Sequence, residues 1–351
     1  MELYFLDRSF GVTCGPTEEF TSAVWSEKYY ETGSFTVHMP KKFFGTAIDA
    51  EYLRTGFGDD GECLCGRIDN VRLTSSDGGE CEISGVMLEG LLGGRVMYGT
   101  GEGSGKLGES VLDAVRSNLR SLPITLDDAG STSSSDVSLD DECVISWKWD
   151  NMAQWLHDVL RPYGASYRVR LKKGAEKPVM TLVRGTNVTD ATLAYSTSLG
   201  NVISLEYEKA YGHIRNYAYV EGGDGTVAVV NKYSVDRREL YKSASELTAE
   251  KYTDDDEYRR ALRQKGEEAL AKYPVSVTLT VSATPGMPPY YGSDCRLGDI
   301  CTVYDDELGI KLSMRMTSAD VVCEGGAEGV YATFGEAVRW RDVLTEGLAD
   351  G

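Results

Sequence analysis

The chain has 351 residues with 36 basic and 55 acidic side chains, which give a formal net charge of −19. This charge argues against a protein that grips nucleic acid by neutralising phosphates, but it fits simple solubility and also a passage through which DNA slides. Apolar residues make up 41% of the sequence, and no apolar run approaches the roughly 20 residues of a membrane-spanning helix. The length predicts two or three domains.

The N-terminus and the cysteines both indicate folding in a reducing cytoplasm. The opening residues, Met-Glu-Leu-Tyr-Phe-Leu-Asp-Arg, lack the basic and long apolar segments of a signal peptide. The eight cysteines are scattered, and the one tight pair, Cys63 and Cys65, has no second pair or histidine nearby. We therefore expect reduced, buried cysteines and no metal site.

Alternating apolar residues predict a barrel-like β module over residues 1–105. Phe35, Val37 and Met39 are typical of the pattern, which Gly- and Asp-rich turns interrupt. The module ends in the Gly-rich run 99–105, which precedes a helix. This run lacks the glycine spacing of a phosphate-binding loop and the hydroxyl that should follow Lys106, so it predicts a flexible linker.

Residues 106–196 predict a small inserted α+β domain. Apolar spacing and turn residues indicate, in chain order, a helix at 111–119, a mobile Ser- and Asp-rich loop at 127–141, a helix at 152–160 with Asp150 as its N-cap, and strands at 167–171 and 179–183.

Residues 197–345 predict a second barrel-like β module, followed by a tail at 346–351. Strand alternation returns at Asn201 and is interrupted by a helix at 254–272, whose acidic residues stand at its start, where the macrodipole favours them. The predicted fold class is mainly β, with two barrel-like modules that flank an α+β domain.

No group of residues predicts catalysis. The carboxylate pairs at 59–60 and 305–306 lie in Gly-containing turns, where Asp serves the backbone. Arg168, Arg170 and Lys172 share one face of a strand, and so short a basic stripe predicts a solvated surface. The three histidines lie in separate segments and are expected at surface or boundary positions: His38, His157 and His213.

Several segments, taken in order, resemble a family of siphophage tail proteins. Residues 21–40 (TSAVWSEKYYETGSFTVHMP) resemble the opening of the hub-like N-terminal part of tail-associated lysins, where an aromatic-rich strand leads to a proline. The resemblance continues through further segments at 64–69, 83–92, 199–209, 296–304 and 331–335. It covers nearly the whole chain and rests on the order and spacing of the set.

The residues that mark the resemblance have a plain structural interpretation, with aromatic side chains on a pleated face and glycines at bends. They are Trp25, Tyr29, Tyr30, Gly33, Phe35, Gly85, Gly200, Asn201, Gly298 and Asp299. We expect no catalytic, cofactor-binding or metal-binding residue among them.

The resemblance implies a structural, non-enzymatic homotrimer, a hub at the virion tail tip that is made in the host bacterial cytoplasm. Two β modules per subunit would form a pseudo-sixfold ring around the DNA channel. The implied partners are the distal tail protein, the tail tube and other tail-tip proteins, with double-stranded DNA passing without specific binding and no cofactor or small-molecule substrate. Members of the family often continue into a lytic or fibre domain, whereas this chain ends after a short helix expected at 338–344, so we expect lytic activity elsewhere.

Two other functions stay open. A host-glycan-binding adhesin would use exposed aromatic side chains such as Tyr290, Tyr291 and Trp340. A glycan-cleaving enzyme would need two carboxylates that face each other across a deep cleft.

Overall fold

The computed structural model describes residues 1–74, 79–127, 139–189, 193–210, 214–232, 236–273, 276–307 and 309–335. Most of the loop predicted at 127–141 lies outside the described residues. So do His213, Trp340, the helix expected at 338–344 and the tail at 346–351.

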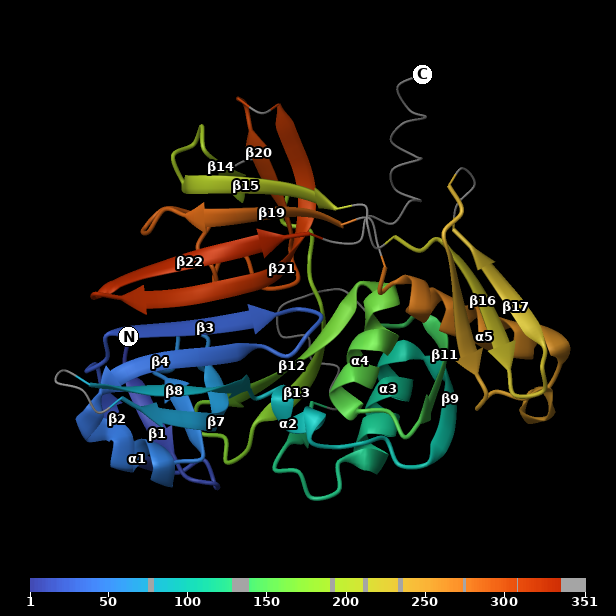
Figure 1. Ribbon diagram of the computed structural model, residues 1–351, viewed down its shortest axis with the longest axis horizontal. Coiled ribbons are helices and arrows are strands. Elements are labelled where there is room, and N and C mark those ends of the chain that lie inside the picture. Colours follow the sequence, from blue (N-terminus) through green and yellow to red (C-terminus); the bar gives the residue numbers. More distant parts are fainter. Residues whose placement is uncertain are drawn as a thin grey trace.

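One long open sheet organises the described part of the chain (Figure 1). Its strand order is β15-β19-β22-β21-β3-β4-β8-β7-β5-β1-β2, with β14 and β20 attached beside β21. The first half of the sheet contains β1 (Leu3–Leu6), β2 (Val12–Thr17), β3 (Ser22–Lys28), β4 (Ser34–Pro40), β5 (Tyr52–Thr55), β7 (Cys65–Leu73) and β8 (Glu80–Met87). The second half contains β14 (Tyr195–Ser196), β15 (Val202–Ala210), β19 (Ser276–Ala283), β20 (Ile300–Asp305), β21 (Ile310–Glu324) and β22 (Ala327–Phe334).

The two halves join where β3 and β21 pair antiparallel along the whole of β3, from Ser22 opposite Glu324 to Lys28 opposite Ser318. The prediction of a mainly β fold is confirmed. The two β modules, however, do not close into separate barrels but share one open sheet. The edge of β3 that a closed barrel would pair with another strand of its own module is paired with β21 of the other module.

The alternation in β3 and β4 explains which face of the sheet is buried. Trp25 and Phe35 lie opposite each other in the register, and their rings stack with centroids 4.9 Å apart. Both rings are almost fully buried, which stabilises the fold by roughly 2–3 kcal/mol for each side chain. The 3₁₀ turn Lys41–Phe43 and α1 (Phe44–Asp49) add Phe43 and Ala47 to the core of this half. The short helix α2 (Gly90–Gly93) places Leu91 and Leu92 in a separate core cluster.

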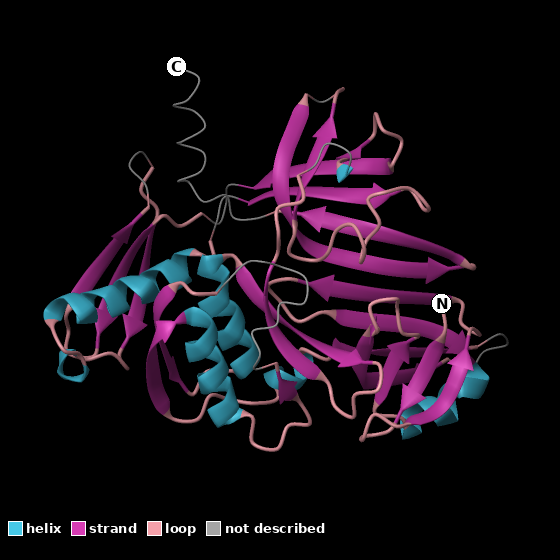
Figure 2. Cartoon of the chain, turned by 180° about the vertical axis from the view of Figure 1, so that it is seen from behind, coloured by secondary structure: helices cyan, strands magenta, loops and turns pink. Residues whose placement is uncertain are grey.

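A first α+β unit lies beside the first half of the sheet (Figure 2). Its elements are β9 (Thr100–Lys106), α3 (Leu107–Asn118), β10 (Thr125–Leu126), β11 (Glu142–Lys148), α4 (Met152–Leu160), the 3₁₀ turn Arg161–Tyr163, β12 (Ala165–Lys172) and β13 (Val179–Arg184). β12 also pairs with β6 (Glu62–Cys63), so this unit is joined to the first half through backbone hydrogen bonds.

The Gly-rich run predicted to be a flexible linker is strand β9, which pairs with β11 along its full length, so the linker prediction is wrong. The physical reason is local packing. A Cβ on Gly101 would lie 2.1 Å from the Trp147 ring, so glycine lets the indole rest on the backbone of the partner strand. The predicted N-cap of α4 is also off by one residue: Asn151 accepts from Gln154 N, whereas Asp150 accepts from Lys148 N.

The strand pattern after residue 216 forms a second α+β unit with its own sheet, not strands of the second β module. It contains β16 (Tyr217–Gly222), β17 (Val227–Asn231), β18 (Glu239–Ala244), the 3₁₀ turn Ala249–Lys251 and α5 (Asp255–Leu270). A Cβ on Gly266 would come within 2.5 Å of Val230, so this glycine lets α5 pack close to the sheet. None of the helices in the described residues is long and apolar enough to cross a membrane. The module boundaries predicted at residues 105 and 196 stay a prediction.

His157, expected at a surface or boundary position, is buried on α4 against Tyr167, with ring centroids 4.8 Å apart. Neither of its ring nitrogens has a hydrogen-bond partner in the described part of the chain. Helical spacing predicted that His157 lies beside the apolar stripe of this helix. In the structure α4 packs so closely on β12 that both the apolar stripe and His157 are buried. Burial lowers the pKa of His157 to about 4.

We predict that His157 makes the fold less stable in mild acid. An unfolded histidine titrates near 6.5, so below that pH the unfolded chain binds a proton that the folded chain does not. The free energy of unfolding should fall by about 2 kcal/mol between pH 7.5 and pH 5 because of this residue. Urea unfolding at several pH values should show a shallower pH dependence for His157→Phe. Equal slopes for the wild type and His157→Phe would contradict the prediction.

Candidate functional site

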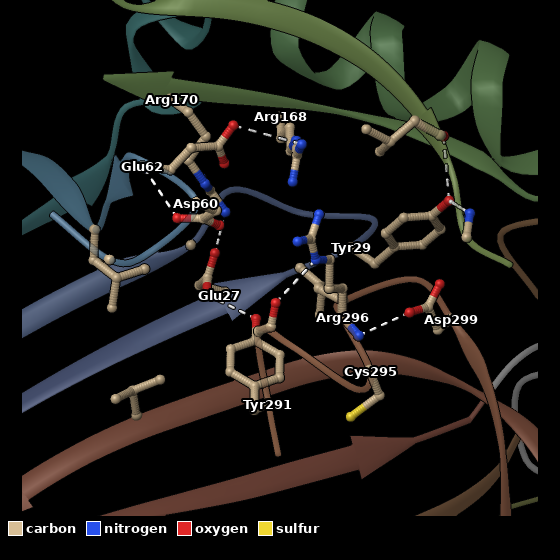
Figure 3. Close-up of a pocket in the computed structure, with 18 of the residues that line it drawn as sticks. Glu27, Tyr29, Asp60, Glu62, Arg168, Arg170, Tyr291, Cys295, Arg296 and Asp299 are labelled. Carbon is tan, nitrogen blue, oxygen red and sulfur yellow. Dashed lines mark hydrogen bonds and ion pairs between the residues drawn. The ribbon is translucent and has the colours of Figure 1, made fainter. Parts of the chain in front are cut away.

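A cavity of about 560 Å³ lies where the two halves of the long sheet meet the first α+β unit (Figure 3). Its wall combines residues near the β3–β4 turn, the segment 55–64, strand β12 and the loop 291–299. We call it the junction cavity. Because its walls come from segments far apart in the sequence, it exists only when all three parts are in place.

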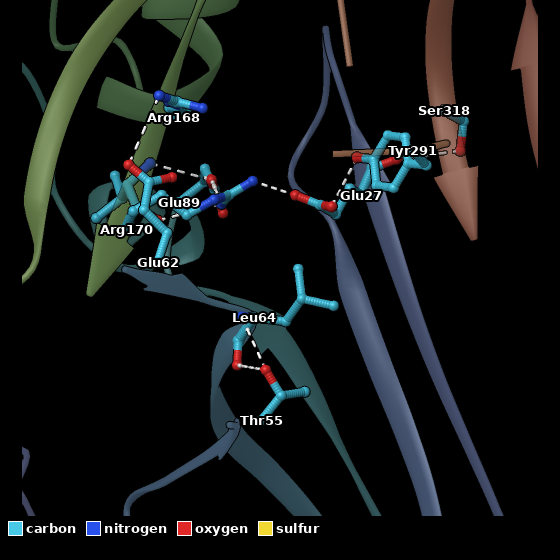
Figure 4. A network of polar contacts seen from close by, with 10 residues as sticks. Glu27, Thr55, Glu62, Leu64, Glu89, Arg168, Arg170, Tyr291 and Ser318 are labelled. Carbon is cyan, nitrogen blue, oxygen red and sulfur yellow. Dashed lines mark hydrogen bonds and ion pairs between the residues drawn. The ribbon is translucent and has the colours of Figure 1, made fainter. Parts of the chain in front are cut away.

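Arg170 on β12 is the centre of a polar network beside this cavity (Figure 4). Its guanidinium pairs with Glu27 on β3 and donates to Glu89 Oε1 over 2.7 Å. The Tyr291 hydroxyl donates to Glu27 Oε2 over 2.7 Å, and Val169 N donates to Glu89 Oε1 over 3.0 Å. The network therefore joins the first half of the sheet, the first α+β unit and the loop of the second half.

The side chains of the Arg170 network are shielded from water: those of Arg170, Glu27 and Glu89 are 12%, 6% and 9% exposed. The prediction that Arg168, Arg170 and Lys172 form a solvated face is therefore wrong for Arg170. Its strand face is covered by β3 and by the loop that carries Tyr291, a tertiary arrangement that the short basic stripe does not reveal.

Electrostatics keeps Arg170 charged and the Tyr291 hydroxyl protonated. Burial alone would lower the pKa of Arg170, but the carboxylates of Glu27 and Glu89 outweigh it and keep the pKa above its ordinary value. Burial, and then the Glu27 charge, raise the pKa of Tyr291 well above its usual range, so its hydroxyl remains a donor. Both carboxylates bind the same guanidinium, an arrangement that holds three segments of the chain together. Acid–base catalysis of glycan cleavage would instead need two carboxylates that face each other across an open cleft.

Tyr29 fixes the same junction from the end of β3. Its hydroxyl lies 3.1 Å from Gly164 O and accepts from Gly185 N over 3.3 Å. Its ring packs on Gly298, where φ is +97° and a Cβ would lie 2.3 Å from the ring. Glycine is thus required at position 298 by both the backbone and the contact.

Asp299 joins the end of β13 to the loop 291–299. Its Oδ1 accepts from Thr186 N over 2.8 Å and from Thr186 Oγ1 over 3.0 Å. Its Oδ2 accepts from Arg296 N over 2.8 Å. The structure thus brings together Tyr29, Gly298 and Asp299, which the sequence presented as separate marker residues.

Most of the other marker residues near the N-terminus pack in the first half of the sheet. Trp25 and Phe35 form its buried stack, and a Cβ on Gly85 would lie 1.9 Å from a backbone oxygen of the neighbouring strand β7. A Cβ on Gly33 would lie 2.3 Å from Ser26 O, and Tyr30 packs edge-on against Tyr29. These positions allow strands and rings to approach closely.

Gly200 and Asn201 lie away from the cavity and shape the start of β15. Asn201 Oδ1 accepts from Ser196 N over 2.9 Å, and its Nδ2 donates to Ala194 O and Pro288 O. Gly200 has φ of +72°. Both residues hold a turn, without a charged or nucleophilic group beside them in these contacts.

Sequence reasoning missed the Arg170 network, although one signal was present. Glu27 occupies the position that alternation with Ala23 and Trp25 assigns to the buried face of β3. A charge on a buried face requires a partner, and the partner comes from a distant strand. Among the described residues, no group of three His, Cys, Asp or Glu side chains could hold a metal ion.

We predict that Arg170→Met lowers the free energy of unfolding by about 3–5 kcal/mol, because it leaves two buried carboxylates without their cation. Chemical denaturation would measure the change. Arg72→Met, at an exposed position of β7, is the matched control and should change stability by less than about 0.5 kcal/mol. Similar effects of the two substitutions would show that the network is not important for stability.

We also predict that Gly298→Ala destabilises the fold by at least about 2 kcal/mol, since the new methyl group meets the Tyr29 ring. Gly200→Ala is the control: its backbone also has positive φ, but no atom lies within 4 Å of the new Cβ. It should cost only the backbone strain of about 1 kcal/mol. Thermal unfolding of both variants tests this, and an equal loss in the two would exclude the Tyr29 contact as the cause.

Solved structures with a similar fold are phage and prophage tail proteins. The tail protein from Neisseria meningitidis MC58 aligns with a TM-score of 0.58 and 15% identity over 97% of this chain and 98% of that chain. Prophage tail protein gp18 from Listeria monocytogenes EGD-e aligns with a TM-score of 0.55 and 13% identity over 100% and 99% of the two chains. The 43 kDa tail protein of prophage MuSo2 from Shewanella oneidensis gives 0.54 and 13% over 95% and 97%.

At these identities the similarity establishes the fold. No curated protein matches the sequence. A family model described as Siphovirus ReqiPepy6 Gp37-like protein matches residues 3–336, nearly the whole chain. The chain therefore belongs to the siphovirus ReqiPepy6 Gp37-like family and has the fold of phage and prophage tail proteins.

Proposed function

We propose that this tail protein is a structural subunit of the tail tip, in which three copies form a hub ring at the end of the tail tube around the DNA channel. The proposal includes contacts with the distal tail protein, the tail tube and other tail-tip proteins, and assembly in the host bacterial cytoplasm. DNA passes through the ring without specific binding, and the subunit has no enzymatic role.

The observation that carries the proposal is an open face that runs across both halves of the long sheet, from β15 to β8 (Figure 1). The register places Trp25 and Phe35 on the buried face, so their neighbours Val24, Ser26 and Thr36 lie on the open one. Hydroxyl side chains dominate this face: Ser26, Ser34, Thr36, Ser84, Ser204, Thr278, Thr280, Ser282, Ser318 and Thr333.

The charges on the open face are mostly acidic. Glu206 and Glu208 on β15, Asp320 on β21 and Glu82 on β8 point to this side, whereas Lys28 stands at a strand end. Hydroxyls offer a duplex no ion pairs, and carboxylates repel its phosphates. A surface of this kind would let DNA slide, because strong phosphate binding depends on Lys and Arg.

The continuity of the sheet also supports a threefold assembly. Each chain contributes two β halves that are fixed edge to edge by the β3–β21 pairing. Three chains would then present six β halves around one axis, which suits a junction between a sixfold tube and threefold parts.

The adhesin alternative has less support. Tyr290 is 48% exposed, but the Tyr291 hydroxyl is engaged with Glu27 in the Arg170 network, which corrects the expectation that Tyr291 is an exposed aromatic. The third aromatic named for this function, Trp340, lies outside the described residues.

The hub proposal predicts a particle of three times the 38.4 kDa chain mass at high protein concentration. Light scattering coupled to size-exclusion chromatography measures the mass, and negative-stain electron microscopy should show threefold rings with an open centre. A monomer at every concentration, together with an absence of rings, would count against the proposal.

If the open face surrounds DNA, new cations there should act together. In the assembled ring, Thr36→Lys with Thr280→Lys adds six lysines around one channel. Binding of a short duplex should strengthen at least tenfold at low salt, with a steeper dependence on salt concentration. The control, Ser117→Lys with Ser243→Lys, adds the same charge at exposed positions outside the face and should change binding little. Fluorescence anisotropy measures both, and equal gains in the two proteins would contradict the assignment of the face.

A further inference from the structure

In the described part of the chain, the sheet of the second α+β unit is covered on one face only. Its strands lie in the order β17-β16-β18, and α5 packs against the face that carries Ala218, Val220 and Val230. Figure 1 shows this sheet at one end of the molecule, away from the long sheet. β18 is the edge nearer the first α+β unit, because Leu240 lines one cavity together with Trp155 of α4. β17 is therefore the outer edge.

The main chain of β17 alternates between its partner strand and the open edge. Gly222 N donates to Thr226 O at one end of the β16–β17 pairing. In an antiparallel pair such bonds recur at every second residue, and the bond that Lys232 N makes at the other end has the same parity. The N–H and C=O groups of Val227 and Val229 therefore point away from β16, where no other described strand pairs with them.

β17 lacks the features that keep edge strands from pairing with other chains. Charged side chains, prolines and bulges commonly protect such edges in natural sheets. Residues 227–231 (VAVVN) include no charge and no proline, and their register with β16 is unbroken. By contrast, β18 carries Glu239 and Lys242, and β2 contains Pro16. A neutral, unprotected edge indicates a strand that pairs with another chain.

The uncovered face beside β17 is largely apolar. Val229, Tyr219 and Tyr241 form a row across the three strands, and Val227 lies opposite Glu221 two residues along β16. Both valines are exposed, although each lies on the same face as the tyrosines. The Glu221 carboxylate accepts from the Tyr241 hydroxyl over 2.6 Å and has no cation partner among the described residues.

The cation on this face is already paired. Arg237 stacks on Tyr217, with its guanidinium carbon 3.7 Å from the ring centroid, and pairs with Glu239 over 2.5 Å. Glu221 therefore leaves the face with an acidic balance, which a basic residue of a partner would complement. A second copy paired through its own β17 offers no such residue, because 227–231 is neutral. The charges thus favour a segment of a different protein.

We propose that the outer edge of β17 binds an extended segment of a different protein, which adds a fourth strand to this sheet and places an apolar residue beside Val229 and a basic one beside Val227. Main-chain hydrogen bonds with Val227 and Val229 would supply the pairing, as when extended peptides add to other open sheet edges. Neighbouring strands lie about 4.8 Å apart, so a lysine or arginine beside Val227 can reach Glu221 across one strand.

The test uses the full chain and a fluorescent peptide, Thr-Lys-Thr-Val-Thr-Lys-Thr, whose pattern is the same in both strand directions. Fluorescence anisotropy should show saturable binding. Hydrogen exchange over residues 226–231, followed by mass spectrometry, should slow when the unlabelled peptide is added. A peptide with glutamate in place of lysine should bind at least tenfold more weakly at low salt, because Glu221 repels it.

Two changes remove main-chain hydrogen bonds without altering any charge. Val229→Pro removes an N–H that β16 does not use, and N-methylation of the central Thr-Val-Thr removes the donors of the peptide. Each should weaken binding at least tenfold. Glu221→Gln should reduce the preference for the lysine peptide over the glutamate peptide. Glu250→Gln, at an exposed position of the same unit, is the control and should keep that preference.

An absence of saturable binding of the lysine peptide would overturn the proposal, as would binding that both Val229→Pro and N-methylation leave unchanged. Exchange over 226–231 that is slow in concentrated protein and fast after dilution would assign the edge to a second copy instead. If thermal unfolding shows that Val229→Pro does not fold, the N-methylated peptide tests the same pairing on the unchanged protein. Because the peptide assay does not require a ring, its outcome is separate from that of the hub proposal.

Discussion

The pairing of Arg170 with Glu27 and Glu89 is the interaction on which the arrangement of the molecule depends. The apolar core does not perform this task alone, since the described buried residues separate into distinct clusters. The cluster of the second half, around Tyr195 and Phe334, is not continuous with the core around Trp25. Between them the contact is made by β3–β21 hydrogen bonds, by Val321 and Cys323 of β21, which pack against the core around Trp25, and by the buried Arg170 network.

A polar contact has a different physical effect from an apolar one at this place. Apolar surfaces tolerate small shifts, whereas a guanidinium between two carboxylates loses much of its stabilisation when either partner moves. Tyr29 adds a second directional contact. Its ring packs against Gly298, where a side chain would clash with it, and its hydroxyl hydrogen-bonds the carbonyl oxygen of Gly164. Together these interactions favour one relative position of the three parts over neighbouring ones.

The sequence predicted the features that depend on local pattern. Alternation located β4 and its buried face, apolar helical spacing located α3 and α4, and the acidic start of the helix located α5. It failed where a distant segment decides the environment. Strand β9 alternates glycine with polar residues and so shows no apolar alternation, and its role appears only when Trp147 packs on Gly101. The burial of Arg170 likewise depends on a tyrosine more than a hundred residues later in the chain.

In the proposed ring, the two β halves of each chain would have to keep one fixed relation, because six halves can close around an axis only at a single set of angles. The β3–β21 pairing makes the sheet continuous, but paired strands can still twist relative to each other by several degrees. The junction opposes that twist, since Tyr291 on one half and Glu27 on the other are held through Arg170 on a third element. The Arg170 junction behind the sheet and the hydroxyl-rich, acidic face in front of it would thus have complementary roles. The junction would fix the shape of the ring, and the face would keep its inner surface from binding the DNA.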